Sequence, residues 1–336
     1  AKAIYYYDAF LNLQPNNPDA HINIGNVHKE QRSLDAAIKS YNKAIELNPN
    51  NSEAFNNLGN ALREKGDLSS AVDAYRTAIK IAPSRPDSHY NLGIVNQQQG
   101  KLANAIASYK EALRLKPFNP DAHINLGNAY QQQGDFSSAI ASYKKVFESK
   151  PSCPNASINI GHCLLSLKNY SEGWKLYEYR QFKSELPSLP HAQPRSQRWC
   201  GDLPSNGSKD LLVISEQGLG DTLQFMRYVI ALRQQGANVS ICAQEKLHTL
   251  IKASGIDQSP LKPQQACNIS RGEWIPLLSV PRHLDVSPDN PIIAEPYIKT
   301  TNELVTKWNN ILSAEQRPII GLNWQGNPEA EKTGLR

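Results

Sequence analysis

The chain has 336 residues, of which 40% are hydrophobic and 20% are charged, and its formal net charge is +5. This length predicts two or three domains, and the composition is ordinary for a soluble protein. The small charge, without any run of lysines and arginines, argues against nucleic acid as a partner. No apolar stretch approaches the roughly 18–20 residues that cross a bilayer, so we expect no transmembrane segment. Five scattered cysteines without CxxC spacing argue against a metal site or disulfides and favour a cytoplasmic location.

Residues 1–184 carry a sequence repeat of 34 residues. Each repeat has a glycine, a small residue twelve positions later and a tyrosine four positions after that: Gly25, Ala37 and Tyr41; Gly59, Ala71 and Tyr75; Gly93, Ala105 and Tyr109; Gly127, Ala139 and Tyr143; Gly161, Gly173 and Tyr177. Repeats begin at residues 18, 52, 86, 120 and 154, and half a repeat precedes them. This is the tetratricopeptide pattern, which predicts helical hairpins that stack into a solenoid with a concave groove.

Polar residues recur on one face of the first predicted helix of each repeat. Asparagines stand at Asn23, Asn57, Asn91, Asn125 and Asn159, and a second row three residues later holds Asn26, Asn60 and Asn128, with Ile94 interrupting it. Asparagine is a poor helix former, so these rows need an explanation. One explanation is hydrogen bonding between repeats that holds their first helices in register. The other is a ladder of amides that binds an extended peptide backbone, because a side-chain amide both donates and accepts.

The repeats resemble those of the O-GlcNAc transferases, whose Asn-Leu-Gly-Asn runs form such a ladder. Asn57-Leu58-Gly59-Asn60 and Asn125-Leu126-Gly127-Asn128 match that run as they stand. The resemblance covers about half of the chain and implies a groove that binds a peptide or protein.

The fifth repeat departs from the others, because Gly173 replaces alanine and its closing proline is shifted. A terminal repeat caps a solenoid, so such a departure is expected. We expect Trp174 and Tyr177 to contact the following domain. A connector rich in proline and serine covers residues 185–210, and we expect Trp199 to anchor this extended segment on the second half of the chain.

Residues 211–316 predict an α/β domain. The hydrophobic pattern indicates strands over 211–215, 238–243 and 274–278, and helices over 221–235, 245–253 and 301–312. A further strand is expected over 318–324. Alternating strands and helices predict a Rossmann-like parallel sheet that binds ligands at the carboxyl ends of its strands. The predicted fold class is therefore an α-solenoid followed by an α/β domain.

The loop after the first strand reads Glu216-Gln217-Gly218-Leu219-Gly220-Asp221-Thr222. Neither the complete dinucleotide fingerprint nor a phosphate-binding GxxxxGK motif is present in the chain. What remains is a glycine loop that leads into the N-terminus of a helix, where Asp221 is either a helix cap or a catalytic group.

The run from Leu211 to Asp221 resembles the opening of the heptosyltransferases of glycosyltransferase family 9, which have the GT-B fold. The resemblance implies that Asp221 is the general base, and that Glu216, Gly218, Gly220 and Thr222 lie on the substrate side. The run Ile319 to Pro328 is similar to the donor-phosphate loop of their second domain, which implies that Trp324, Gly326, Asn327, Lys332 and Arg336 face the donor. The combination with repeats resembles a bacterial group of such enzymes.

These resemblances imply a glycosyltransferase that transfers a sugar from a nucleotide-sugar donor, without a metal or other cofactor, to a peptide or protein held by the repeats. We expect residues 317–336 to be only the start of the second GT-B half, so the donor site would be incomplete and the chain inactive alone. The alternative is a non-catalytic scaffold that binds proteins through its groove.

Overall fold

The computed structural model describes residues 14, 16–182, 190–199, 201, 209–216, 218–287, 289–292, 297–299, 302–303 and 305–307. These residues form two compact portions. The repeat portion contains the described residues before 188 together with the segment 285–291, which lies in the sequence between two parts of the sheet portion. The sheet portion contains the remaining residues. No described helix combines the length and the apolarity needed to cross a membrane.

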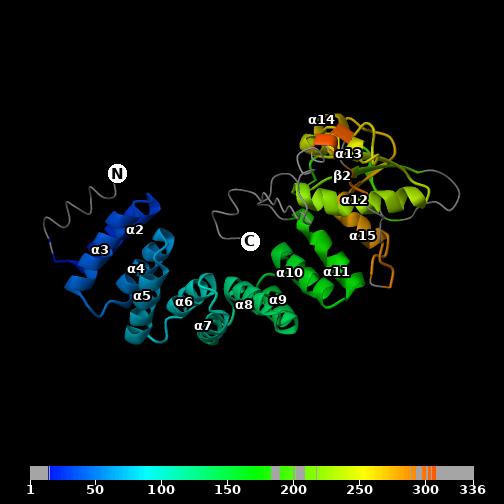
Figure 1. The fold of residues 1–336 in the computed structure, drawn as a ribbon. Helices are drawn as coiled ribbons and strands as arrows, with labels where there is room; N and C mark the ends of the chain where they lie inside the picture. The colour runs from blue at the N-terminus through cyan, green and yellow to red at the C-terminus, as the bar shows by residue number, and fades with distance from the viewer. Residues whose placement is uncertain are drawn as a thin grey trace, which may run out of the picture. The chain divides into compact units, whose positions relative to one another are not determined.

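The repeat portion is a row of antiparallel helix pairs (Figure 1). The first helices of the five repeats are α2 (Pro18–Glu30), α4 (Ser52–Lys65), α6 (Pro86–Gln98), α8 (Pro120–Gln133) and α10 (Pro154–Ser166). The second helices are α3 (Leu34–Leu47), α5 (Leu68–Ile81), α7 (Leu102–Leu115), α9 (Phe136–Ser149) and α11 (Tyr170–Tyr177). The helical solenoid predicted from the repeat is confirmed.

Local sequence explains where the first helices begin. Four of them have proline in the first turn, where its missing N–H is no loss. The side chains of Asn17, Asn51 and Asn119 cap three of these helices by accepting from backbone N–H groups of the first turn. Gly66 and Gly134 end α4 and α8 in the left-handed conformation that glycine adopts at no steric cost.

The repeated glycine and tyrosine pack directly on each other. A Cβ added to Gly25, Gly59, Gly93 or Gly127 would lie 2.4–2.6 Å from a ring carbon of the tyrosine sixteen residues later. These tyrosines are fully buried, and Ala37, Ala71, Ala105 and Ala139 beside them are 0% exposed. Only glycine therefore leaves room for the ring between the two helices of a repeat.

The fifth repeat closes differently. A Cβ on Gly161 would meet the backbone of the second helix, at 3.0 Å from Tyr177 N and 3.1 Å from Gly173 O. The two backbones thus approach each other where the other repeats hold a tyrosine ring. The indole Nε1 of Trp174 donates to Val286 O at 3.1 Å, which fastens the returning segment 285–291 to the last repeat.

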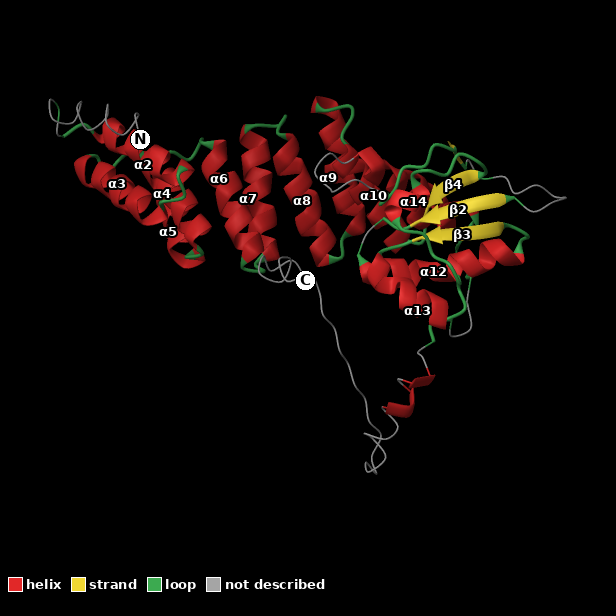
Figure 2. Ribbon diagram, turned by 90° about the horizontal axis from the view of Figure 1, so that it is seen from above, coloured by secondary structure: helices red, strands yellow, loops and turns green. Residues whose placement is uncertain are grey.

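The sheet portion contains a parallel four-stranded sheet with the order β1-β4-β2-β3. The strands are β1 (Gln197–Arg198), β2 (Asp210–Ile214), β3 (Asn238–Cys242) and β4 (Glu273–Pro276). Figure 2 shows β4, β2 and β3 side by side and pointing the same way. A small parallel sheet in this half of the chain is confirmed.

Two layers cover the central strand β2. Leu212 and Ile214 pack with Cys242 and with Ala266 of α14 (Pro263–Ala266). Leu211 and Val213 point to the opposite face because side chains alternate along a strand, and α12 (Leu219–Gln234) lies on that side (Figure 1). All four side chains are buried, which explains why β2 is a continuous apolar run.

Several element boundaries differ from those predicted. Helix α12 begins at Leu219, two residues before the predicted start. The helix expected over 245–253 begins as a 3-10 turn, η2 (Glu245–Leu247), before α13 (His248–Ala253), and the strand expected over 274–278 gives way to η3 (Leu277–Ser279) and α15 (Val280–His283). The predicted strand over 318–324 lies outside the described residues.

The connector contributes to the sheet. Gln197 and Arg198 form the edge strand β1, paired in parallel with β4. Trp199 follows it and is 2% exposed. Its backbone N–H donates to Trp274 O at 2.8 Å, and its ring centroid lies 4.9 Å from that of His283. The aromatic anchor expected in the connector is present, and the strand beside it was not predicted.

Candidate functional site

The first helices of the repeats form one continuous surface. Helix α4 contacts both α2 and α6, and α6 contacts α8, so successive first helices touch one another directly. Each second helix instead contacts the first helix of the next repeat. In Figure 1 the first helices follow the inner edge of the curved row. We call this surface, formed by α2, α4, α6, α8 and α10, the inner face.

The asparagines at the sixth position of each repeat connect neighbouring first helices. Nδ2 donates in each case to the preceding repeat: Asn57 to Asn26 Oδ1 (3.3 Å), Asn91 to Asn56 Oδ1 (3.2 Å), Asn125 to Tyr90 Oη (2.9 Å) and Asn159 to Asn128 Oδ1 (3.2 Å). The hydrogen bonds between repeats, which were the first explanation of the asparagine row, are therefore present. These bonds fix the amide planes along the inner face.

Each sixth-position amide keeps part of its hydrogen-bonding capacity. The side chains of Asn57, Asn91 and Asn125 are only half-buried. A primary amide has two N–H donors and one carbonyl acceptor, and one N–H is used for the preceding repeat. Within the part of the chain that the structure describes, the Oδ1 atoms of these three residues accept no hydrogen bond. The geometry thus allows both explanations of the row at once.

The ninth-position asparagines hold the buried tyrosines. Tyr41, Tyr75 and Tyr143 donate their hydroxyls to Asn26, Asn60 and Asn128 Oδ1, each at 2.8 Å. Burial raises the pKa of Tyr75 to about 12, and burial also raises the pKa of Tyr41 and Tyr143. The hydroxyls therefore stay protonated and remain donors throughout the neutral range. The second asparagine row thus links the inner face to the core of each repeat.

The third repeat departs from this arrangement. Ile94 occupies the ninth position, so the hydroxyl of Tyr109 donates instead to Gln97 Oε1 at 2.9 Å. Tyr90 stands at the fifth position, where its hydroxyl accepts from Asn125 and its ring centroid lies 5.9 Å from that of Tyr109. Both Tyr90 and Ile94 are half-buried. The amide-lined inner face is thus interrupted by one apolar contact surface.

The loop at the carboxyl end of β2 divides the predicted loop residues into two groups. Glu216 and Thr222 are buried, at 1% and 0% exposure. Glu216 Oε2 accepts from Leu278 N at 3.0 Å, and the Thr222 hydroxyl lies 3.1 Å from Gly218 O and 3.0 Å from Gln244 Oε1. Gly218 and Gly220 are exposed, and Asp221 is half-buried. Glu216 and Thr222 therefore fix the loop through buried hydrogen bonds, whereas Gly218, Gly220 and Asp221 are at least partly exposed to solvent.

Asp221 is not the cap of α12. The helix begins at Leu219 with Gly218 as its N-cap, so Asp221 lies in the first turn. Its negative charge there interacts favourably with the helix dipole. A Cβ added to Gly218 would meet only Asp221 Oδ2, at 3.6 Å, which is ordinary contact. The described residues therefore do not require glycine at this position.

The strand order places this loop at a crossover point. The second strand of the α/β pattern, β3, lies on one side of β2, and the third, β4, lies on the other. In doubly wound sheets ligands bind where the strand order reverses, outside the carboxyl ends of the strands. The bond from Leu278 N to Glu216 Oε2 joins the ends of β2 and β4 at that point.

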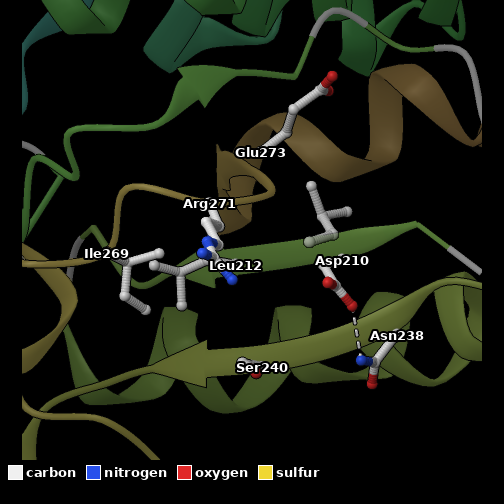
Figure 3. Close-up of a pocket in the computed structure, with 8 residues that line it drawn as sticks. Asp210, Leu212, Asn238, Ser240, Ile269, Arg271 and Glu273 are labelled. Atoms are coloured by element: carbon white, nitrogen blue, oxygen red, sulfur yellow. Dashed lines mark hydrogen bonds between the residues drawn. The ribbon is translucent and has the colours of Figure 1, made fainter.

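A separate hollow of about 280 Å³ lies at the opposite, amino end of the same strands (Figure 3). Asp210 and Asn238 line it and are joined by a 2.7 Å hydrogen bond, and Ile269 and Arg271 also line it. None of the predicted site residues lines this hollow.

Comparison with known proteins identifies the repeats. Models of the tetratricopeptide repeat match residues 18–51, 40–73 and 120–153, and a further model described as a TPR repeat matches residues 59–100 and 97–134. These are tetratricopeptide repeats. No curated protein matches the chain.

Several solved structures are similar to the tetratricopeptide portion. A crystal structure of MamA protein is 24% identical, with a TM-score of 0.46, and covers 52% of this chain and 98% of its own. YrrB, a TPR protein with an unusual peptide-binding site, is 20% identical, with a TM-score of 0.47, and covers 52% and 91%. PilF of Pseudomonas aeruginosa is 20% identical, with a TM-score of 0.45, and covers 52% and 85%.

The predicted donor-side residues Trp324, Gly326, Asn327, Lys332 and Arg336 lie outside the described residues. The sequence pattern did not predict the roles of two inner-face residues of the tetratricopeptide repeats. Asn56 is buried and accepts from Asn91, and Tyr90 accepts from Asn125. Both occupy the fifth position, where Ile22, Ile124 and Ile158 stand in the other repeats. A polar group at a position that is isoleucine in the other repeats could have indicated these two hydrogen-bond acceptors.

Proposed function

We propose that the inner face of the tetratricopeptide repeats binds an extended segment of a partner protein. The observation that carries this proposal is the row of half-buried sixth-position amides at Asn57, Asn91 and Asn125. Each is held by one N–H, and each carbonyl oxygen accepts no hydrogen bond among the described residues. An extended peptide exposes alternating N–H and C=O groups, and an amide pairs with both.

The spacing of the row supports this ligand. Packed helices lie about 8–10 Å apart, and an extended chain advances about 3.3 Å per residue. One amide would therefore meet about every third residue of the ligand. Because the inter-repeat bonds already fix the amides, little side-chain freedom is lost when the ligand binds.

The experiment is selection of a random peptide library, displayed on phage, against the immobilised chain, followed by binding measurements on the selected peptides. A variant with Asn57, Asn91 and Asn125 all replaced by alanine should lose most of the affinity. Loss of about 1 kcal/mol for each amide would weaken binding by roughly a hundredfold in total. Unchanged affinity of a folded triple variant would rule out the amide row as the binding surface.

We propose glycosyl transfer as a second candidate function, with the nucleotide-sugar donor and an Asp221 general base implied by the family resemblance. The observation that favours it is the position of exposed Gly218 and half-buried Asp221 at the N-terminus of α12, after the carboxyl end of the parallel strand β2. Asp221 would accept the proton of an acceptor hydroxyl, and the N-terminus of α12 would favour an anionic group. This chemistry needs no metal.

Isothermal titration of the chain with a panel of nucleotide sugars tests the second candidate. Saturable binding of one member that is weakened by a bulky residue at Gly218 would support it. For a protein that shows transfer activity, Asp221→Asn should abolish transfer without changing the melting temperature. The absence of binding at millimolar concentration would favour a non-catalytic scaffold.

A further inference from the structure

The third repeat breaks the amide pattern of the inner face at two positions. Ile94 replaces the ninth-position asparagine, and Tyr90 replaces the fifth-position residue that is buried in the first, second and fifth repeats. The two lie one helical turn apart on α6, on the same face. A peptide group placed over Ile94 would find no partner there, whereas an apolar side chain would bury surface against it.

Charged groups of opposite sign lie on the repeats that flank this surface. Burial raises the pKa of the Tyr90 hydroxyl, Asp121 raises it further, and Arg63 and the hydrogen bond from Asn125 lower it. Asp121 belongs to the fourth repeat and Arg63 to the second, so Tyr90 has an anion on one side and a cation on the other. Arg63 is half-buried and also lowers the pKa of the Tyr75 hydroxyl, and Asp121 is exposed.

We propose that Tyr90 and Ile94 form a specificity site for one apolar side chain of the bound peptide, with an acidic ligand residue facing Arg63 and a basic one facing Asp121. This inference rests on the proposed peptide-binding function and defines its register. With helices about 8–10 Å apart and about 3.3 Å per extended residue, each charge lies about three residues from the apolar residue.

The ligand class follows from desolvation. The amide row binds any backbone, so it supplies affinity without selectivity. Ile94 selects against polar residues, because a polar group buried against it would lose its hydrogen bonds to water. Charge complementarity then disfavours a basic ligand residue beside Arg63 and an acidic ligand residue beside Asp121.

The test uses three fluorescent peptides of about 11 residues in a glycine–serine background, long enough to span three repeats. The first carries glutamate, leucine and lysine at intervals of about three residues. The second has asparagine in place of leucine, and the third has glutamate in place of lysine. Fluorescence polarisation with the full chain should show the second and third binding about tenfold more weakly than the first.

The matched variants are Ile94→Asn and Ile94→Val. Asparagine already stands at this position in three other repeats, where it accepts from the buried tyrosine, so the first variant should fold with Tyr109 bonded to the new amide. Ile94→Asn should remove the preference for leucine over asparagine, and Ile94→Val should retain it. Circular dichroism confirms that both variants are helical.

The outcomes separate this inference from the proposed function. If the chain binds the leucine and asparagine peptides equally, or if Ile94→Asn keeps the preference, the specificity site is wrong and peptide binding stands. If peptides from the random library bind but none of the three designed peptides does, the specificity site is again wrong. If no peptide of any kind binds, both proposals fail.

Discussion

The side chain of Asn91 donates from Nδ2 to Oδ1 of Asn56, in the preceding repeat, at 3.2 Å. Asn56 is 6% exposed and also accepts from Ser88 Oγ, whereas Asn91 is half-buried. One partner of this bond is therefore inaccessible to a ligand, and the other is accessible. Substitution of each residue in turn can therefore distinguish the structural role of the amide row from its proposed role in binding.

Gly93→Ala should destabilise the third repeat. The added Cβ would lie 2.5 Å from a ring carbon of Tyr109, which is 0% exposed and cannot move aside. Overpacking of this kind costs about 1–3 kcal/mol, measured as the free energy of unfolding by chemical denaturation. In a Tyr109→Leu background the same substitution should cost less, and equal costs in both backgrounds would show that the ring contact is not the cause.

Stability should fall with pH above about 10. Burial raises the pKa of Tyr75 to about 12, so between the ordinary value near 10 and about 12 the folded chain keeps a proton that the unfolded chain loses. Folding then binds protons, and this contribution is complete below pH 10 and is lost as the pH rises. The loss approaches about 1.4 kcal/mol per pH unit for one tyrosine.

The check is chemical denaturation at several pH values, comparing the original chain with Tyr75→Phe. The variant should show a shallower fall, because one of the buried hydroxyls is absent. Identical slopes in the two proteins would assign the effect to other groups, such as lysines.

Trp174→Phe should loosen the segment 285–291. The substitution keeps an aromatic ring but removes the Nε1 donor to Val286 O. The loss of one hydrogen bond, about 1 kcal/mol, corresponds to roughly fivefold faster opening of the segment. Hydrogen exchange followed by mass spectrometry measures this on peptides that cover residues 285–291. Peptides from α2 and α3 serve as the internal control, and unchanged exchange at 285–291 would mean that the bond does not hold the segment.

Glu216→Ala should destabilise the sheet portion. The backbone N–H of Leu278 would lose its acceptor in a buried place, which costs about 1–3 kcal/mol. Glu216→Gln keeps an acceptor oxygen and should cost less. Thermal unfolding followed by tryptophan fluorescence compares the two. An alanine variant more stable than the original would instead show that desolvation of the carboxylate dominates.

Periodic features of the fold were predictable from the sequence. The helix pairs follow from the spacing of Gly59 and Tyr75, because a helical hairpin is a local structure whose core repeats every 34 residues. The apolar run at β2 likewise predicted a buried parallel strand. Each prediction depended on residues close together in the sequence.

Contacts between distant segments were not predictable. The bond from Trp174 to Val286 spans 112 residues, and the placement of β4 beside β2 depends on how the chain crosses the sheet. The acceptor of each sixth-position amide could not be predicted from the sequence either. Asn91 and Asn125 donate to fifth-position residues, whereas Asn57 and Asn159 donate to ninth-position asparagines. Such choices depend on side chains of neighbouring repeats.

The matched pair Asn91→Ala and Asn56→Ala tests peptide binding by the inner face most directly. Both variants remove the same hydrogen bond and should lower stability by about 1–3 kcal/mol, but only Asn91→Ala removes an accessible amide. Titration with peptides selected from the random library should show about five- to tenfold weaker binding for Asn91→Ala. The loss should be smaller for Asn56→Ala, which only frees the Asn91 amide from the bond that fixes it. Equal losses in both variants would show that the amide row acts only by holding the repeats together and does not bind the peptide.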